Sequence, residues 1–283
     1  MKPFGYNLNL FDMSKFDRAP SGSSKHKVPA AWSEFAGDRH FATTLARGLE
    51  LLRCFSPSEP LLGVSELARR LGLPLSTVSR LSYTLVQMGY LTQAQGWGKY
   101  RLGVAMLSLG YPLLEQFSFR QRVRPLLMAF AQEIDGNVSI GIRDRLSIVY
   151  IESIRARERG AYPLDVGVTQ SLAGTAVGRA YLMSCSADER RTLLNEIKVK
   201  APLEWDRHAQ RVQDNIAQYP QRGCCISMGE VYPEVQAVAV PLGRIEGGMP
   251  AAMNCSFFGR EMDERWLLDV VGPRLLRLAR QLA

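Results

Sequence analysis

Residues 75–88 carry hydrogen-bonding side chains on what would be one face of a helix. Arg80 lies on that face, where a guanidinium can donate two hydrogen bonds to the O6 and N7 atoms of guanine. Ser76 and Thr77 stand near the start of the segment, where hydroxyls and free backbone N–H groups can meet base edges or phosphates. Tyr83, Thr84 and Gln87 lie on the same polar face. We expect Ser76, Thr77, Arg80, Tyr83 and Thr84 to contact DNA, although Arg80 taken alone is equally compatible with an ordinary solvated arginine.

Three amphipathic helices are predicted between residues 43 and 88. Apolar residues recur every three or four positions in each, which is the pattern of a helix with one buried face. Ser65 can cap the second helix, and Gly89 can end the third. The expected buried faces are Leu45, Leu49, Leu52 and Phe55 in the first helix, Leu67, Ala68 and Leu71 in the second, and Val78, Leu81, Leu85 and Met88 in the third.

Two short strands are predicted after the third helix, at 90–93 and 99–102, around a turn at 94–98. Lys99 and Arg101 in the second strand can hold phosphates. Three helices followed by such a hairpin are the elements of a winged helix-turn-helix, whose third helix enters the major groove of double-stranded DNA. The sequence therefore predicts a DNA-reading domain here.

The net charge of +8 is confined to the first part of the chain. Residues 1–125 carry 16 Lys and Arg against 8 Asp and Glu, whereas residues 126–283 carry 19 of each class. A merely soluble basic protein would spread its surplus, but a protein that neutralises phosphates needs a local excess. The distribution favours nucleic-acid binding. A non-specific architectural DNA binder is an alternative, but it would not need a large neutral second part.

Length and composition predict about two domains, at roughly 100–200 residues each. No uninterrupted apolar run reaches the roughly 18 residues that a membrane span needs, and no secretory signal follows Lys2. The five cysteines are an odd number without a CxxC pair, which is typical of a reducing compartment. We expect a cytoplasmic protein.

Residues 1–40 have no lasting periodicity and contain three prolines and a Ser-Gly-Ser-Ser run. We expect a disordered N-terminal arm. A mobile basic arm, and translation that begins nearer Met13, are two alternatives.

The second part of the chain has the mixed periodicity of an α/β domain. A connecting helix is expected at 104–117, kinked or broken at Pro112, and a further helix at 120–135. Asp263 can cap a last helix with a kink at Gly272-Pro273. Buried residues expected in 120–135 are Val123, Leu126, Leu127, Phe130, Ala131 and Ile134; other expected elements are strands at 138–142, 147–154, 235–242 and 251–258 and helices at 173–184 and 188–197.

Two blocks of sequence, in this order, resemble the IclR-type transcriptional regulators over roughly residues 42–283. The first block is shared with other winged regulators, but the two blocks together are much more specific to this family. The first block comprises residues 45–49, 65–73, 76–81, 89–91 and 100–103. The second block comprises residues 172–180, 233–241 and 251–256.

The resemblance implies an α+β protein in which a GAF-like effector domain binds a small organic or aromatic acid. It also implies homodimers or homotetramers on palindromic operators. Implied domains are the arm at 1–40, a winged helix-turn-helix at 41–103, a linker helix at 104–119, and an effector-binding and oligomerisation domain at 120–283. The implied pocket residues are Ala173, Gly174, Thr175, Glu230, Ala237, Asn254 and Ser256.

Free N–H groups at a helix start near Thr175 would suit a carboxylate, and Asn254 and Ser256 share one strand face. Alternatively, these polar groups only cap a helix and stabilise a strand. Four positions depart from the family pattern, which has His, Pro and Gly at the first three and often Ser or Thr at the last. They are Ala173, Ser171, Glu234 and Pro74.

An enzyme built on the C-terminal domain is the main alternative function. No segment has the spacing of a phosphate-binding P-loop. Cys224 or Cys225 with His208 would form a nucleophile and base only if the fold brings them together. Glu230 and Glu234 are candidate paired acids or simply solvated charges. Two of the three histidines lie in or beside the arm, so no metal or other cofactor is expected.

Overall fold

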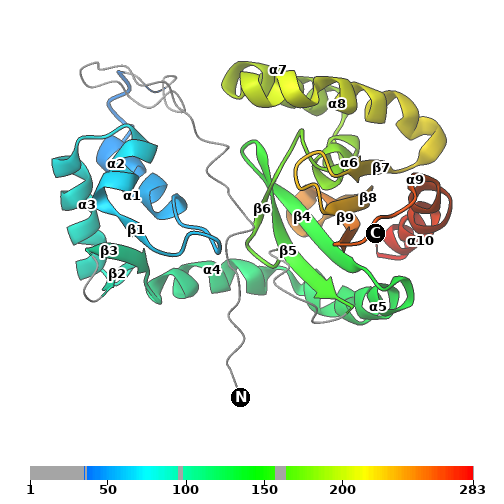
Figure 1. The fold of residues 1–283 in the computed structure, drawn as a ribbon, viewed down its shortest axis with the longest axis horizontal. Helices are drawn as coiled ribbons and strands as arrows, with labels where there is room; N and C mark the ends of the chain where they lie inside the picture. The colour runs from blue at the N-terminus through cyan, green and yellow to red at the C-terminus, as the bar shows by residue number, and fades with distance from the viewer. Residues whose placement is uncertain (1–34, 36, 95–97, 157–163, 283) are drawn as a thin grey trace. The chain divides into compact units, whose positions relative to one another are not determined.

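The computed structural model describes residues 35, 37–94, 98–156 and 164–282, and the chain divides into two compact units, residues 1–113 and 114–283 (Figure 1). The expected arm at 1–40 falls outside the described residues apart from its last positions, as does the tip of the predicted hairpin turn. The division between the units lies within α4 (Ala105–Gln116), the helix expected as the linker.

The N-terminal unit contains the three predicted helices and the hairpin, around a core of leucines and smaller apolar residues. A two-residue strand, too short to show alternation in the sequence, adds a third strand to the hairpin in the order β1-β3-β2. The elements are α1 (Thr43–Arg53), β1 (Leu62–Gly63), α2 (Val64–Leu71), α3 (Leu75–Gln87), β2 (Leu91–Ala94) and β3 (Lys99–Leu102).

Several predictions about which residues of the N-terminal helices are buried or cap a helix are wrong. Leu45 and Leu49 are 64% and 51% exposed, because α1 is buried near its end, at Leu51 and Leu52. Ser65 does not cap α2: the N-cap is Gly63 and the helix begins at Val64, because Gly63 ends β1, where it pairs with Lys99 of β3. In α3 the expected Met88 is exposed as well.

A kink or a break was expected at Pro112; helix α4 continues through this proline, so the break is wrong. None of its residues is buried within the part of the chain that the structure describes. Its exposed apolar side chains are Leu107, Leu109, Tyr111 and Leu113.

The C-terminal unit is built on a six-stranded antiparallel sheet in the order β6-β5-β4-β9-β8-β7. One face packs on α5 and α10, and the other packs on α6, which α7 and α8 cover in turn. The elements are α5 (Ser118–Ile134), β4 (Asn137–Asp144), β5 (Ser147–Arg155), β6 (Thr169–Ser171), α6 (Ala176–Ser184), α7 (Ala187–Lys200), α8 (Pro202–Arg222), β7 (Cys225–Met228), β8 (Val235–Ile245), β9 (Met249–Phe258), α9 (Glu264–Trp266) and α10 (Gly272–Leu282).

The predicted strands are all present in this unit, whereas β6, β7 and α8 were not predicted. Leu126 of α5 is exposed rather than buried. Asp263 caps α9 as expected, by accepting from the Arg265 N–H (3.0 Å). The kink expected at Gly272-Pro273 corresponds to a π-helical turn at Leu267–Val271, just before Gly272. Pro273 has no N–H to donate to the preceding turn, which favours such an irregularity.

No helix among the described residues has the length and apolar character to cross a membrane. Within the same residues, no group of three or more His, Cys, Asp or Glu side chains is placed to hold a metal ion. All five cysteines are free thiols, and four of them are buried.

Candidate functional site

Helix α3 begins without a side-chain cap. Its N-cap is Pro74, with φ −59° and ψ 144°, and the Pro74 carbonyl accepts from the N–H groups of Thr77 and Val78. The first N–H groups of the helix therefore have no partner inside it, and together with the helix dipole they favour an anion such as phosphate. Ser76 is exposed at this end and Thr77 is half-buried.

Burial of Val78 and Ser82 fixes the inner face of α3. Arg80 is exposed on the outer face, together with Tyr83, which is 66% exposed. Among the described residues, Arg80 has no hydrogen-bond or ion-pair partner for its guanidinium. The Thr84 hydroxyl donates to the backbone carbonyl of Arg80 (3.1 Å) and so keeps only its acceptor capacity for a ligand.

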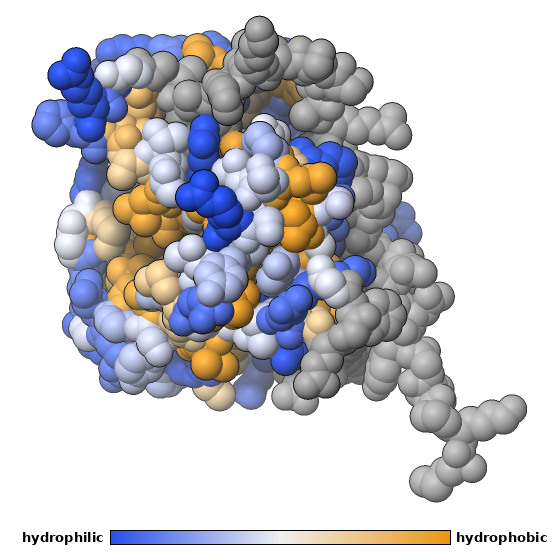
Figure 2. All heavy atoms as spheres, turned by 90° about the vertical axis from the view of Figure 1, so that its left-hand side faces the viewer, coloured by the Kyte–Doolittle hydropathy of each residue, from blue (hydrophilic) through white to orange (hydrophobic). Residues whose placement is uncertain are grey.

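The hairpin after α3 adds two cations. Ala94 pairs with Lys99 and Thr92 with Arg101, so the two basic side chains leave the same face of β3. Arg101 is exposed and Lys99 is half-buried. The side of the molecule seen in Figure 2 mixes hydrophilic and apolar side chains, and the exposed apolar residues of the N-terminal unit include Leu75.

An ion-pair network that we did not anticipate holds α2 against the preceding loop. The Glu66 carboxylate accepts hydrogen bonds from Arg69 (2.6 Å) and Arg70 (2.7 Å). Arg70 also donates to Glu59 (2.5 Å) and to the Cys54 carbonyl (3.2 Å). The guanidinium of Arg69, and then that of Arg70, lower the pKa of Glu66 to about 2. Only the i, i+4 spacing of Glu66 and Arg70 gave a signal in the sequence.

In the C-terminal unit, a tight loop leads from β6 into α6. Thr175 is the N-cap of α6, and its hydroxyl oxygen accepts from the Gly178 N–H (3.2 Å). Ser171, at the position where the family has proline, accepts from the Gly174 N–H (2.6 Å) and donates to Glu204. The loop is therefore rigidly hydrogen-bonded, and the first N–H groups of α6 open toward its pocket side.

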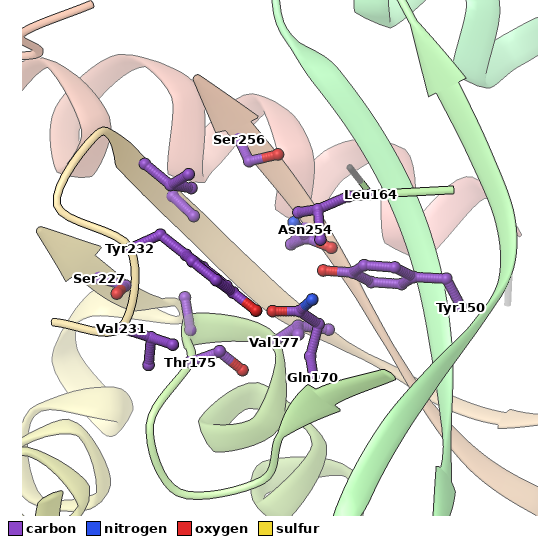
Figure 3. A pocket seen from close by; sticks show the side chains of 13 residues that line it. Tyr150, Leu164, Gln170, Thr175, Val177, Ser227, Val231, Tyr232, Asn254 and Ser256 are labelled. Atoms are coloured by element: carbon purple, nitrogen blue, oxygen red, sulfur yellow. The ribbon is translucent and has the colours of Figure 1, made fainter. Parts of the chain in front are cut away.

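A small pocket lies between this loop, the sheet and the β7–β8 connection (Figure 3). Its volume is about 30 Å³, which is room for about two waters at ~10–15 Å³ each. No ionisable acid or base other than tyrosine contributes to its lining within the described residues. The lining residues are Tyr150, Leu164, Gln170, Thr175, Ala176, Val177, Ser227, Val231, Tyr232, Val235, Ala237, Asn254 and Ser256.

Four of the seven predicted pocket residues line this pocket: Thr175, Ala237, Asn254 and Ser256. Ala173, Gly174 and Glu230 do not line it. Gly174 lies where a Cβ atom would be 2.7 Å from Val231 and 3.1 Å from His208 Nε2, so its role is close packing. Glu230 accepts from the Ser227 hydroxyl and from the Met228 N–H (2.7 Å), so its carboxylate holds the β7–β8 connection.

A buried arginine joins the two loops that flank the pocket. The Arg179 guanidinium, in α6, donates to the carbonyls of Ala173 (3.2 Å), Gly174 (3.3 Å) and Ile226 (2.5 Å). Arg179 is 1% exposed. Burial lowers the pKa of its guanidinium, whereas the nearby Glu230 carboxylate raises it and so offsets part of this effect. The sequence shows an ordinary arginine at this position, so its role was missed.

The other residues that we missed are polar side chains whose neighbours in the fold are far apart in the sequence. Tyr150 comes from a predicted strand, whereas Gln170 belongs to β6 and Tyr232 to a connection that shows no periodicity. Two amide atoms in the pocket, Gln170 Nε2 and Asn254 Oδ1, are buried and have no hydrogen-bond partner among the described residues. Such groups are costly unless a water or ligand satisfies them.

The thiols considered as nucleophiles are poorly suited to that role. Burial raises the pKa of Cys224 to about 11 and that of Cys225 to about 12, so both are protonated at neutral pH. Burial also lowers the pKa of His208. Glu234 is exposed, and Glu230 is occupied by its hydrogen bonds, so the two do not form a buried acid pair.

Comparison with known proteins gives matches across both units. Residues 44–95 match the model of the IclR helix-turn-helix domain, and residues 112–283 match that of the bacterial transcriptional regulator IclR C-terminal domain. The regulator TsaQ1/TsaQ2 of Comamonas testosteroni is 29% identical over 84% of this chain and 86% of its own. The Pca regulon regulatory protein of Pseudomonas putida is 27% identical over 88% of this chain and 85% of its own.

Solved structures agree with this result. An IclR family transcriptional regulator from Brucella abortus is 35% identical, covers 93% of this chain and 95% of its own, and superposes with a TM-score of 0.76. An IclR homolog from Microbacterium hydrocarbonoxydans, complexed with 4-hydroxybenzoate, shares the fold at 19% identity, with a TM-score of 0.59 over 84% of this chain and 99% of its own. The named relatives are regulators and repressors, which supports a regulator and not an enzyme.

Proposed function

Because the chain belongs to the IclR family of bacterial transcriptional regulators, we propose that α3 and the β2–β3 hairpin read an operator and that the pocket of the α/β unit controls this binding. Ser76, Thr77, Arg80, Tyr83 and Thr84 are proposed to contact bases and nearby phosphates. Lys99 and Arg101 are proposed to hold the DNA backbone. Such a regulator acts in the cytoplasm, where its operator lies.

The guanidinium of Arg80, which is exposed and has no partner among the residues that the structure describes, is the observation that carries this proposal. An ordinary solvated arginine would be exposed in the same way. Arg80, however, projects from a helix whose opposite face is anchored by Val78 and Ser82. A guanidinium held in this way can make the bidentate contact to guanine that specifies sequence.

The proposed effector is a small organic acid. The first N–H groups of α6 suit a carboxylate, since Ala176 and Val177 line the pocket at the positive end of the helix dipole. The Microbacterium relative is complexed with 4-hydroxybenzoate, which supports an aromatic acid as the effector of this chain. Effector binding would change operator affinity by favouring one arrangement of two reading units in a homodimer or homotetramer.

Selection of binding sites from a pool of random duplex DNA tests the DNA-reading part. The full chain should enrich one sequence, and Arg80→Ala should enrich it poorly. The effector part is tested by a thermal-shift screen of small organic acids, because a ligand that binds the folded state raises its Tm. Enrichment of no sequence would reject the operator proposal, and turnover of a bound acid would reject the regulatory role of the pocket.

A further inference from the structure

The pocket of the C-terminal unit is too small for the ligand that its position suggests. Its volume is about 30 Å³. A cavity that holds a single benzene ring in a protein has a volume of about 150 Å³. A ring can therefore enter only if a side chain leaves the pocket.

Tyr232 is the side chain that fills the space. It lies on the connection between β7 and β8, and its ring extends into the pocket so that the hydroxyl points at the amide of Gln170 (Figure 3). A hydrogen bond joins the Tyr232 hydroxyl to the Gln170 side chain, and burial raises the pKa of the phenol. The half-buried tyrosine thus places its ring in a polar site in the way that a bound phenol would.

The groups around Tyr232 are not all satisfied by it. Gln170 is 4% exposed and Asn254 is 2% exposed, and in the part of the chain that the structure describes neither Gln170 Nε2 nor Asn254 Oδ1 has a hydrogen-bond partner. A structural tyrosine would be expected to leave its neighbours paired, since an unpaired buried amide costs about 1–3 kcal/mol. These atoms indicate a site that is completed by a ligand with more hydrogen-bonding groups than Tyr232 offers.

The connection that carries Tyr232 is anchored by side-chain contacts at its base, whereas at Tyr232 its backbone is held by the Tyr232 carbonyl, which accepts from the Val235 N–H (2.9 Å). Glu230 is held by Ser227 and the Met228 N–H, and its carboxylate lies 3.4 Å from Arg211. Gly229 precedes it with a positive φ of 89°. Tyr232 lies two residues beyond this anchor, so its side chain can leave the pocket while Glu230 stays in place.

We propose that Tyr232 occupies the place of the effector ring in the ligand-free protein, and that the effector is a single-ring aromatic compound with a ring hydroxyl that displaces it and takes over its contact to Gln170. This rests on the proposed role of the pocket as the effector site. In this proposal, the open state is the minor conformation in which the Tyr232 side chain has left the pocket. The apparent affinity of the effector is then its intrinsic affinity for the open state multiplied by the fraction of molecules in that state. Tyr232 then sets both the class of ligand and the concentration to which the regulator responds.

The test uses p-cresol, which is the tyrosine side chain itself, as the probe. In the full-length variant Tyr232→Ala, p-cresol should bind at least about tenfold more tightly than it binds the wild type, as expected when the competing side chain is removed from a state populated at about 10% or less. Isothermal titration calorimetry measures both constants. Toluene, which lacks the hydroxyl, should bind the variant more weakly than p-cresol, and Gln170→Leu should remove this difference in the Tyr232→Ala background.

Two variants control for non-specific effects. Tyr219→Ala removes another partly buried tyrosine, which packs on the same side of the sheet but does not line the pocket, so it should gain no p-cresol binding. Tyr232→Phe keeps the ring, and should also exclude p-cresol. Circular dichroism shows whether each variant is folded, and Tyr232→Leu replaces Tyr232→Ala if the latter is not.

Equal binding of p-cresol by the folded variant and the wild type would overturn the inference. So would equal gains in Tyr232→Ala and Tyr219→Ala. The proposed function fails in a different way: p-cresol would bind Tyr232→Ala tightly, but no pocket ligand would change the affinity for the selected DNA.

Discussion

Arg179 Nη2 lies 3.8 Å from Glu230 Oε1, beside the pocket of the C-terminal unit. The arginine also donates to the loop before α6, while the glutamate accepts from the chain that follows β7. The pair therefore connects the two loops from which Thr175 and Tyr232 reach the pocket. A charge buried to this degree is tolerated because carbonyl oxygens and one carboxylate surround it.

Arg179→Met should destabilise the C-terminal unit by about 3 kcal/mol, because it leaves carbonyls and most of the Glu230 charge without their buried partner. Arg179→Lys should lose less, since it keeps the charge but not the planar fork. Urea unfolding measures both. Arg207→Met, on an exposed arginine of α8, is the control and should change stability by no more than about 0.5 kcal/mol. Equal stability of Arg179→Met and wild type would contradict the assigned role.

Gly178→Ala should disrupt the start of α6. A Cβ atom at this position would lie 2.2 Å from the Leu172 carbonyl oxygen, so backbone must move. We expect a loss of at least about 2 kcal/mol in unfolding free energy. Gly110→Ala, in the exposed helix α4, meets no atom within 4 Å and should instead stabilise by up to about 1 kcal/mol. A neutral Gly178→Ala would show that the loop before α6 is not packed as described.

Glu66 should make the N-terminal unit sensitive to acid. Its pKa falls from 4.5 to about 2 on folding, so the stabilisation is complete above the unfolded value and is lost as the pH falls from about 4.5 through about 2. Glu66→Gln removes the carboxylate and with it this pH-dependent stabilisation. Thermal unfolding at about pH 7 and about pH 3 should show a Tm difference between wild type and variant that shrinks at the lower pH. A pH-independent difference would contradict the ion-pair network.

Local periodicity was sufficient to predict the three helices and hairpin of the reading unit and most strands of the second unit. It failed where tertiary contacts decide. Leu45 and Leu49 fit a buried stripe, yet nothing in the described chain covers that end of α1. In the pocket, Thr175 and Asn254 were predicted through the resemblance to the family, because both lie in sequence blocks that match it. Gln170 and Tyr232 were missed because only the assembled sheet and loops bring them together.

Ser256→Phe should abolish the response to an acid found in the thermal-shift screen while DNA binding is kept. Ser256 is buried and lines the pocket, so a ring at this position fills the space that a ligand needs. Ser256→Ala is the matched control, and should retain most of the ligand-induced rise in Tm. An unchanged ligand titration in Ser256→Phe would reject the pocket as the effector site.

Arg80 provides the most direct test of sequence reading by α3. Fluorescence anisotropy should compare wild type with Arg80→Ala on the selected operator duplex and on a shuffled duplex of the same composition, at one salt concentration. If Arg80 reads guanine, the variant loses about 1–3 kcal/mol on the operator and little on the shuffled duplex. An equal loss on both duplexes would make Arg80 a phosphate contact, and no loss on either would contradict the reading of DNA through this face of α3.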